Sequence, residues 1–297
     1  MNLTNEFKQK VRTAILEKRQ NYGGSDTDFS KSLGINNTVF SRLKSGETDR
    51  IIGDTIWLTI GRELQVSLFE DNWKVARTSV YTEIEDNLNF CKEFSKAMVL
   101  VDDCGIGKPF CAKHIIRKMK NTFYVDCSQA KSKQLFIRLL AKTVGIDNHG
   151  KYNEVLANLK YYINTLAPGK PLVILDEAGD LDYTAFLELK GIWNGTDGVC
   201  GWYMMGADGL RDKIDRGINN KKVGFAEIFD RFSDEFIKLV PNGKDDRQQF
   251  YSQLISDVAS ANVGDKTKIK GLINKCLNKS LSKEKTLRSL KTYIEIG

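Results

Sequence analysis

Apolar residues in the first 66 positions recur at the spacing of an α-helix. Residues on one helix face stand four apart in the first predicted helix and again in the fourth: Phe7, Val11 and Ile15, then Ile56, Ile60 and Leu64. Two shorter segments lie between them, one that Ser25 can cap and one that Asn36 or Asn37 can cap. The pattern predicts four helices and no strand over residues 1–66.

A glycine turn divides the two middle helices, over residues 26–46. Gly34 makes the turn, and the small Ser30 stands where two crossing helices must approach closely. The apolar residues that pack this pair together are Phe29, Leu33, Ile35, Phe40 and Leu43. Two short helices joined in this way form the helix-turn-helix pattern, and residues 5–65 resemble the lambda-repressor-like DNA-binding domains.

The resemblance implies that the exposed side of the third helix contacts DNA. The residues expected to touch duplex DNA there are Asn37, Thr38, Ser41, Arg42 and Lys44. Asparagine and arginine read adenine and guanine edges in the major groove, whereas Lys44 and Ser45 would hold phosphate. A four-helix bundle that contacts another protein would show the same apolar spacing, and that alternative stays open at this point.

From residue 81 onward, short apolar runs alternate with helical patterns. The runs that predict strands are 97–101, 122–126, 171–175, 202–205 and 236–240. Residues 171–175 are apolar without interruption, which is typical of a strand buried on both faces. This alternation predicts an α/β fold with a parallel sheet flanked by helices.

The first of these strands ends in a loop that resembles a phosphate-binding loop. It reads DDCGIGKP over residues 102–109, where the standard pattern is G-x-x-x-x-G-K-[ST] between a strand and a helix. Glycines let backbone N–H groups approach phosphates closely, and Lys108 would reach the β- and γ-phosphates. The residues expected to bind the nucleotide are Asp103, Cys104, Gly105, Ile106, Gly107, Lys108 and Pro109.

Two positions of this loop depart from the standard pattern. Asp102 stands in place of the first glycine, and Pro109 stands in place of the serine or threonine. Proline has no hydroxyl to ligate magnesium and no backbone N–H for phosphate, although a helix tolerates it in the first turn. The loop therefore predicts ATP binding and leaves the rate of ATP hydrolysis open.

The run at 171–175 ends in two acids, which matches the Walker B pattern. Asp176 would hold Mg²⁺ directly or through water, and Glu177 would orient and polarise the attacking water. Two adjacent acids at the end of a buried strand need a partner, because burying charge is costly. The alternative is that an acid caps the next helix.

With these elements in order, residues 97–290 resemble the AAA+ ATPases. The resemblance implies three further catalytic residues: Asp208 as sensor 1 after the fourth strand, Arg231 as the arginine finger, and Arg288 as sensor 2 on a late helix. Arg231 would then reach ATP bound in a neighbouring subunit, and Arg288 would face the nucleotide of its own subunit.

Longer phrases resemble one branch of that family, the transposition ATPases that include the phage Mu transposition protein B and the TniB-like and IstB-like proteins. These phrases are DEAGDLDYTAFLELKGIWNGTDGVCGWYMMGADGL at 176–210 and KVGFAEIFDRFSDEF at 222–236. The resemblance implies ATP and Mg²⁺ as cofactors. It also implies self-assembly into a ring or helical filament on double-stranded DNA, and delivery of target DNA to a transposase.

The same resemblance sets the expected domain boundaries. They are a helix-turn-helix domain at 1–66, a linker at 67–80 that includes the polar stretch 70–72, an AAA+ core at 81–241 and a helical lid at 242–297.

Basic residues after the second strand are candidates for contact with DNA along the ATPase core. They are Lys131, Lys133 and Lys151, in a region that the resemblance places toward a central channel. Each phosphate that they neutralise would steepen the salt dependence of DNA binding. A second basic group is either another contact or a solvated face: Arg211, Lys213, Arg216, Lys221 and Lys222.

Composition narrows the class of protein only slightly. A net charge of +7 permits nucleic-acid binding without requiring it. The six cysteines form no CxxC pair, there are two histidines, and no apolar run reaches the roughly 20 residues that cross a bilayer. We expect a cytoplasmic protein of a bacterium, phage or mobile element, with no membrane partner. Two rival functions stay open: a transcriptional regulator with an inactive ATPase core, and a helicase loader.

Overall fold

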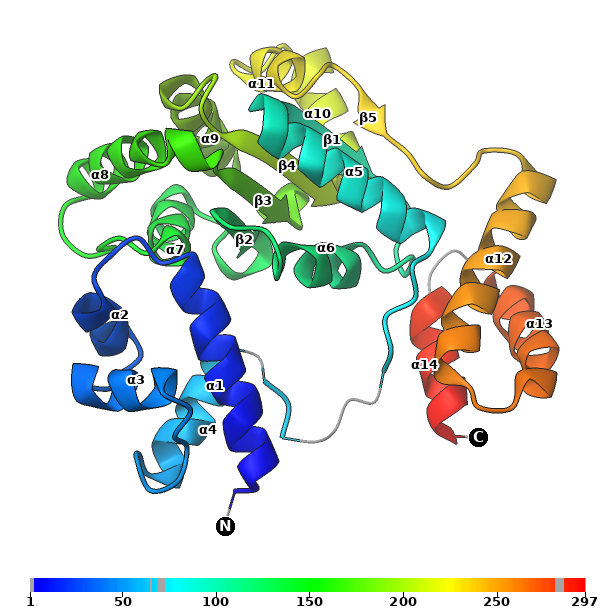
Figure 1. Ribbon diagram of the computed structural model, residues 1–297. Coiled ribbons are helices and arrows are strands. Elements are labelled where there is room, and N and C mark those ends of the chain that lie inside the picture. The colour runs from blue at the N-terminus through cyan, green and yellow to red at the C-terminus, as the bar shows by residue number, and fades with distance from the viewer. Residues whose placement is uncertain (1–2, 65, 69–72, 281–285, 297) are drawn as a thin grey trace.

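The computed structural model describes residues 3–64, 66–68, 73–280 and 286–296. The chain runs from four N-terminal helices through a five-stranded sheet to three C-terminal helices (Figure 1). The expected linker at 67–80, with its polar stretch 70–72, lies partly outside the described residues.

The four N-terminal helices are α1 (Asn5–Gln20), α2 (Asp26–Ser32), α3 (Asn37–Lys44) and α4 (Asp54–Glu63). Thr4, Ser25 and Asn36 cap the first three, because each side chain accepts a hydrogen bond from a backbone N–H of the first turn. The predicted apolar residues of α1 to α3 form one buried cluster. In α4 the core position belongs to Trp57, which is fully buried, whereas Ile56 is 38% exposed.

Five parallel strands form one sheet in the order β2-β3-β4-β1-β5. They are β1 (Ala97–Val101), β2 (Thr122–Asp126), β3 (Leu172–Asp176), β4 (Gly201–Gly206) and β5 (Phe236–Ile237). β1 and β2 have the bounds that the apolar runs predict. β5 is shorter than predicted, because the N–H groups of Leu239 and Val240 bond to the Asp102 carboxylate instead of a neighbouring strand.

Helices cover both faces of this sheet (Figure 1). One face packs against α7 (Lys133–Val144), α8 (Tyr152–Thr165), α9 (Tyr183–Gly195), α10 (Asp208–Asn219) and α11 (Phe225–Arg231). The other face packs against α5 (Ser79–Phe94) and α6 (Lys108–Ile116). In β3 the side chains alternate between these layers, with Val173 and Leu175 in the first and Leu172 and Ile174 in the second. The prediction of a parallel sheet flanked by helices is confirmed.

Four short 3₁₀ segments connect these elements: η1 (Cys127–Gln129), η2 (Ala167–Gly169), η3 (Ala178–Asp180) and η4 (Lys266–Lys268). The chain ends in α12 (Lys244–Asn262), α13 (Ile269–Ser280) and α14 (Thr286–Ile296). These three helices share a small buried cluster of their own, formed by Ile255, Val258, Ala259, Leu272, Cys276 and Leu290.

The turn between α1 and α2 touches the sheet domain. The Asn121 backbone N–H donates to the Asn21 side-chain oxygen at 2.7 Å, and Lys142 pairs with Glu63 at 3.5 Å. Gly145, which ends α7 at φ +93°, leaves room for the ring of Tyr22, since a Cβ there would lie 2.7 Å from that ring. The N-terminal helices therefore contact the body through specific contacts as well as through the linker.

Candidate nucleotide site and candidate DNA-binding surfaces

The loop between β1 and α6 has the backbone shape of a phosphate-binding loop. Gly105 and Gly107 adopt φ angles of +83° and +94°, which residues with a side chain rarely adopt. Gly107 is the N-cap of α6, and no side chain caps that helix end. The first N–H groups of a helix lack intrahelical partners and bind anions well. The loop therefore leaves backbone donors for a phosphate group.

Lys108 lies inside this loop and is only 6% exposed. Its Nζ donates to the backbone oxygens of Asp102 at 2.7 Å and Asp103 at 2.8 Å. Burial lowers the pKa of Lys108, while the nearby carboxylates, Glu177 and Asp176 among them, oppose that change. Phosphate oxygens would offer this ammonium stronger partners than the two carbonyl groups that it contacts here.

Asp102, which replaces the first glycine of the standard pattern, has a structural task. Its carboxylate is 2% exposed and accepts hydrogen bonds from the N–H groups of Asp103 at 2.7 Å, Leu239 at 2.5 Å and Val240 at 2.9 Å. A buried carboxylate with several N–H donors is well satisfied. Asp102 thus ties the phosphate loop to the chain that leaves β5.

Pro109 is the second residue of α6 and fits that helix without a break. Its side chain has no hydroxyl, so residue 109 cannot provide the usual side-chain ligand for magnesium. Among the described residues, no group of three or more histidine, cysteine, aspartate or glutamate side chains is arranged to hold a metal ion.

Asp176 ends β3 and is 6% exposed. Its Oδ2 accepts a hydrogen bond from the hydroxyl of Tyr124 on the adjacent strand β2. Burial raises the pKa of Asp176, and the hydrogen bond from Tyr124 acts against that change. One carboxylate oxygen is thereby oriented by the protein, as is typical for an acid that holds a ligand.

Glu177 follows in a left-handed backbone conformation with φ +50°. This conformation is uncommon for a residue with a side chain, and the side chain is exposed. Although the residue is exposed, partial burial of its carboxyl group is the first cause that raises the pKa of Glu177, and repulsion from Asp176 is the second. A carboxylate with a raised pKa is suited to accept a proton from water.

Two C-terminal helices contact the phosphate loop, and the contact made by α12 was not expected from the sequence. The Asp103 carboxylate accepts from Arg247 and from the hydroxyl of Tyr251, both on α12. At the start of α14, the Leu287 N–H donates to the Gly105 oxygen at 3.2 Å. The C-terminal helices are therefore in direct contact with the candidate nucleotide site.

The other residues expected in catalysis lie farther out. Asp208 begins α10 with a side chain that is 77% exposed, and it pairs with Arg211 at 3.6 Å. Arg211 itself donates to the Val101 oxygen, at the end of β1, at 3.4 Å. Arg288 is exposed and follows the residue that contacts the loop. The roles of Asp208 and Arg288 stay predictions.

Arg231, the expected arginine finger, ends α11 on the surface. Its Nε donates to the side chain of Asn194 at 2.8 Å, Nη1 donates to the Glu227 oxygen at 2.8 Å, and the guanidinium lies 5.2 Å from the ring centre of Trp193. These contacts hold Arg231 on the surface of α9, where a second subunit could approach it.

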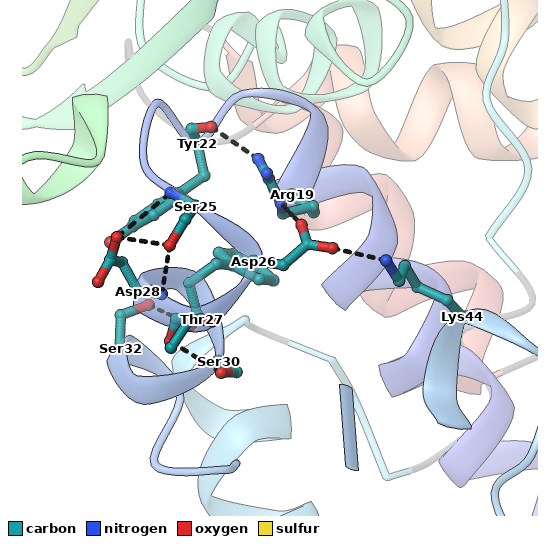
Figure 2. Close-up of polar contacts among 10 residues, drawn as sticks. Arg19, Tyr22, Ser25, Asp26, Thr27, Asp28, Ser30, Ser32 and Lys44 are labelled. Atoms are coloured by element: carbon teal, nitrogen blue, oxygen red, sulfur yellow. Dashed lines mark hydrogen bonds and ion pairs between the residues drawn. The ribbon is translucent and has the colours of Figure 1, made fainter. Parts of the chain in front are cut away.

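On α3, all five residues expected to contact DNA have exposed side chains: Asn37, Thr38, Ser41, Arg42 and Lys44. Arg42 pairs with Glu47 at 2.7 Å. Figure 2 shows Asp26 at the start of α2 between Arg19 of α1 and Lys44 of α3, at 2.7 Å and 2.5 Å. Asp26 thus links α2 to both neighbouring helices and neutralises part of the charge of α3. The helix-turn-helix interpretation stays a prediction.

The lysines expected along the ATPase core also have partners. Lys131 pairs with Asp180 at 3.0 Å, and Lys133 pairs with Glu188 at 3.6 Å, while Lys151 is exposed at the start of α8. In the second basic group, Lys213 donates to the oxygens of Gly179 and Leu181 and Arg216 pairs with Asp212. Both groups thus contact the segment that follows the Walker B acids, through Lys131 at Asp180 and through Lys213 at Gly179 and Leu181.

A parallel sheet of this strand order, with a phosphate loop after β1 and paired acids after β3, has the AAA+ P-loop NTPase fold. The sequence profile of the AAA domain matches residues 91–214. No curated protein matches the sequence.

The chain is also similar to solved structures. The ORC1 protein of Aeropyrum pernix, in complex with DNA, superposes with a TM-score of 0.54 at 12% identity, over 75% of this chain and 59% of its own. The ORC2 protein of the same organism, with ADPNP and ADP, gives 0.47 at 15% identity, over 69% and 59%. Cdc6p of Pyrobaculum aerophilum gives 0.39 at 11%, over 71% and 65%. The chain thus spans about three fifths of the length of these proteins, and the superposition on ORC1 supports the AAA+ fold.

Among the described helices, none is both long enough and apolar enough to span a bilayer.

Proposed function

We propose that this chain is an ATP-dependent DNA-binding AAA+ protein that selects target DNA and delivers it to a transposase. The observation that carries the ATP-dependent part is the placement of Lys108 at the carboxyl end of the same parallel sheet as Asp176 and Glu177. Lys108 begins α6 after the loop that follows β1, Asp176 ends β3, and the charges of Glu177 and Asp176 join that of Asp102 in opposing the lowering of the pKa of Lys108 by burial. A cation and two acids at the same edge of a parallel sheet are the groups that phosphoryl transfer requires.

Each residue has a task in this proposal. Lys108 and the N–H groups of the loop hold the β- and γ-phosphates, and Asp176 holds Mg²⁺, which polarises the phosphate oxygens. Glu177 accepts a proton from the attacking water. Arg231 of a neighbouring subunit completes the site, so nucleotide binding and self-assembly depend on each other.

The DNA-binding part depends on α3 and on the basic residues of the core. Arg42 and Asn37 would read base edges, while Lys131, Lys133 and Lys151 would contact the backbone. Ion pairs between exposed side chains contribute little, so Arg42 and Lys131 can exchange a carboxylate for a phosphate at small cost. The similarity of fold to ORC1, which was solved on DNA, is in keeping with this proposal.

A second candidate function has an observation in its favour. Pro109 removes the hydroxyl that ordinarily ligates magnesium, so the protein would bind ATP without hydrolysing it and act as a transcriptional regulator. The helicase-loader alternative gains no such observation.

Binding of duplex DNA distinguishes the target-selecting ATPase from the transcriptional regulator. We expect a fluorescent duplex to bind more tightly with ATP than without it, with affinity that rises with duplex length and little dependence on base sequence. Addition of the transposase of the same mobile element should then increase strand transfer into the bound duplex. One discrete footprint, independent of duplex length, would instead identify the regulator.

A further inference from the structure

The Asp103 carboxylate of the phosphate loop has side chains as its hydrogen-bond donors and, among the described residues, no backbone N–H. Asp102, beside it, accepts three backbone N–H groups. The Asp103 side chain is 18% exposed and faces α12, where its Oδ2 accepts from Arg247 and from the hydroxyl of Tyr251. The partners of this carboxylate therefore come from the lid rather than from the loop.

The two donors are built as a unit on α12. Arg247 and Tyr251 stand four residues apart, which places them on one face of the helix. The guanidinium of Arg247 lies 5.4 Å from the ring centre of Tyr251, and Tyr251 is 6% exposed. Burial, followed by the hydrogen bond to Asp103, raises the pKa of Tyr251. The hydroxyl thus stays protonated and able to donate.

A second lid helix meets the same loop from another position. The Leu287 N–H of α14 donates to the Gly105 oxygen, and the Leu287 side chain would lie 3.3 Å from a Cβ on Gly107. The lid therefore contacts the phosphate loop at Asp103 through charge and at Gly105 and Gly107 through backbone and packing. Of these contacts, only the ion pair at Asp103 can be removed by substituting one charged side chain.

We propose that Asp103 and Arg247 are positioning residues that fasten the lid to the phosphate loop and so slow the release of bound nucleotide. This inference rests on the proposed binding of ATP. Arg247 also neutralises an acid that would otherwise repel phosphate groups at the loop. Charge-assisted hydrogen bonds are stronger than neutral ones. The pair therefore holds the lid closed against the phosphate loop, although the two residues are 144 positions apart in the sequence.

Four variants test the closure: Arg247→Gln, Asp103→Asn, the double variant, and Tyr251→Phe. Lys244→Gln is the matched control, because it removes one exposed cation from the first turn of the same helix. The first measurement is amide hydrogen exchange over α12 without nucleotide. The second is the release rate of a fluorescent ATP analogue. Circular dichroism confirms that each variant is folded.

We expect Arg247→Gln to lose protection along α12 and to release the analogue about tenfold faster or more, from the typical strength of a charged hydrogen bond. The double variant should resemble the single ones, because both remove one shared contact. Tyr251→Phe, which keeps the ring, should show a smaller change, and Lys244→Gln none.

Native exchange along α12 in Arg247→Gln and Tyr251→Phe would overturn the closure. Native release rates in both variants would overturn its effect on the nucleotide. If the native chain binds no ATP analogue at all, the proposed function fails, and the slowing of release fails with it. Hydrogen exchange still decides separately whether the pair fastens the lid.

Discussion

The hydroxyl of Tyr124 donates a hydrogen bond to Oδ2 of Asp176, across the boundary between β2 and β3. The two strands run in parallel, and Asp126 pairs in register with Asp176. Asp176 is therefore oriented by one neighbour and repelled by another, while burial raises its pKa. Such an arrangement costs stability and is expected where a carboxylate has a ligand to hold.

This cost gives a prediction for stability. A carboxyl whose pKa is raised by folding stabilises the fold while it is protonated, and that contribution is lost as the pH rises through the raised pKa. Asp176→Asn removes the charge and keeps an acceptor for Tyr124. We expect its free energy of unfolding at neutral pH to exceed that of the native chain, because the substitution removes a charge that burial disfavours.

The extra stability of Asp176→Asn should shrink as the pH falls below the ordinary carboxyl range, where the native side chain is protonated in both the folded and the unfolded state. Urea unfolding at neutral and acidic pH measures both quantities. Lower stability of the variant at neutral pH would mean that Asp176 has a cationic partner in the fold that outweighs its burial.

Lys108 is expected to supply a large part of nucleotide affinity. Lys108→Ala removes the buried ammonium between the loop carbonyls and the acids. We expect ATP affinity to fall about a hundredfold, since hydrogen bonds to charged groups contribute about 1.5–3 kcal/mol each. Titration of a fluorescent ATP analogue measures the loss. Lys118→Ala, an exposed lysine just beyond α6, serves as the control, and equal losses in both variants would contradict the assignment.

Glu177 is expected to set the pH dependence of hydrolysis. As a base it must be ionised, and its pKa is raised by burial and by Asp176. The rate should therefore fall, as the pH is lowered, at a higher pH than an ordinary glutamate would give. Glu177→Gln should abolish turnover and prolong any ATP-dependent complex with DNA. Faster release of DNA from Glu177→Gln would rule out hydrolysis as the step that loosens the complex.

The surface of α3 gives a prediction for DNA binding. Arg42 is exposed, and its pairing with Glu47 joins two half-exposed side chains, so DNA can replace that partner at little cost. Arg42→Ala should weaken binding by about 1–3 kcal/mol if the side chain reads a base. Fluorescence anisotropy at fixed salt measures the affinity, and Arg50→Ala, an arginine outside the helix with a 93% exposed side chain, is the control.

Equal losses in Arg42→Ala and Arg50→Ala would show a general effect of charge. No loss in either variant would favour the four-helix bundle that contacts another protein.

Local patterns in the sequence predict much of this architecture. Continuous apolar runs mark buried strands, and β1 and β2 begin and end where those runs do. The positive φ angle of Gly107 occurs at a position where the loop pattern has a glycine. These features depend on a few adjacent residues, so the local sequence is enough to predict them.

Features that depend on residues far apart in the sequence cannot be predicted from local patterns. The pairing of Asp103 with Arg247 and the hydrogen bond of Tyr124 to Asp176 join residues that only the fold brings together. The sequence does not predict α5, because Phe90 and Phe94, which are 42% and 61% exposed, interrupt its apolar pattern. The shortness of β5 likewise depends on the side chain of Asp102.

ATP hydrolysis with and without duplex DNA, compared between the native chain and Pro109→Thr, tests the central claim most directly. The account predicts that the native chain hydrolyses ATP, that duplex DNA increases the rate, and that Pro109→Thr is faster because threonine restores a magnesium ligand. Activity in Pro109→Thr alone would identify the native protein as an ATP-binding regulator. Absence of both hydrolysis and ATP binding in both proteins would contradict the account.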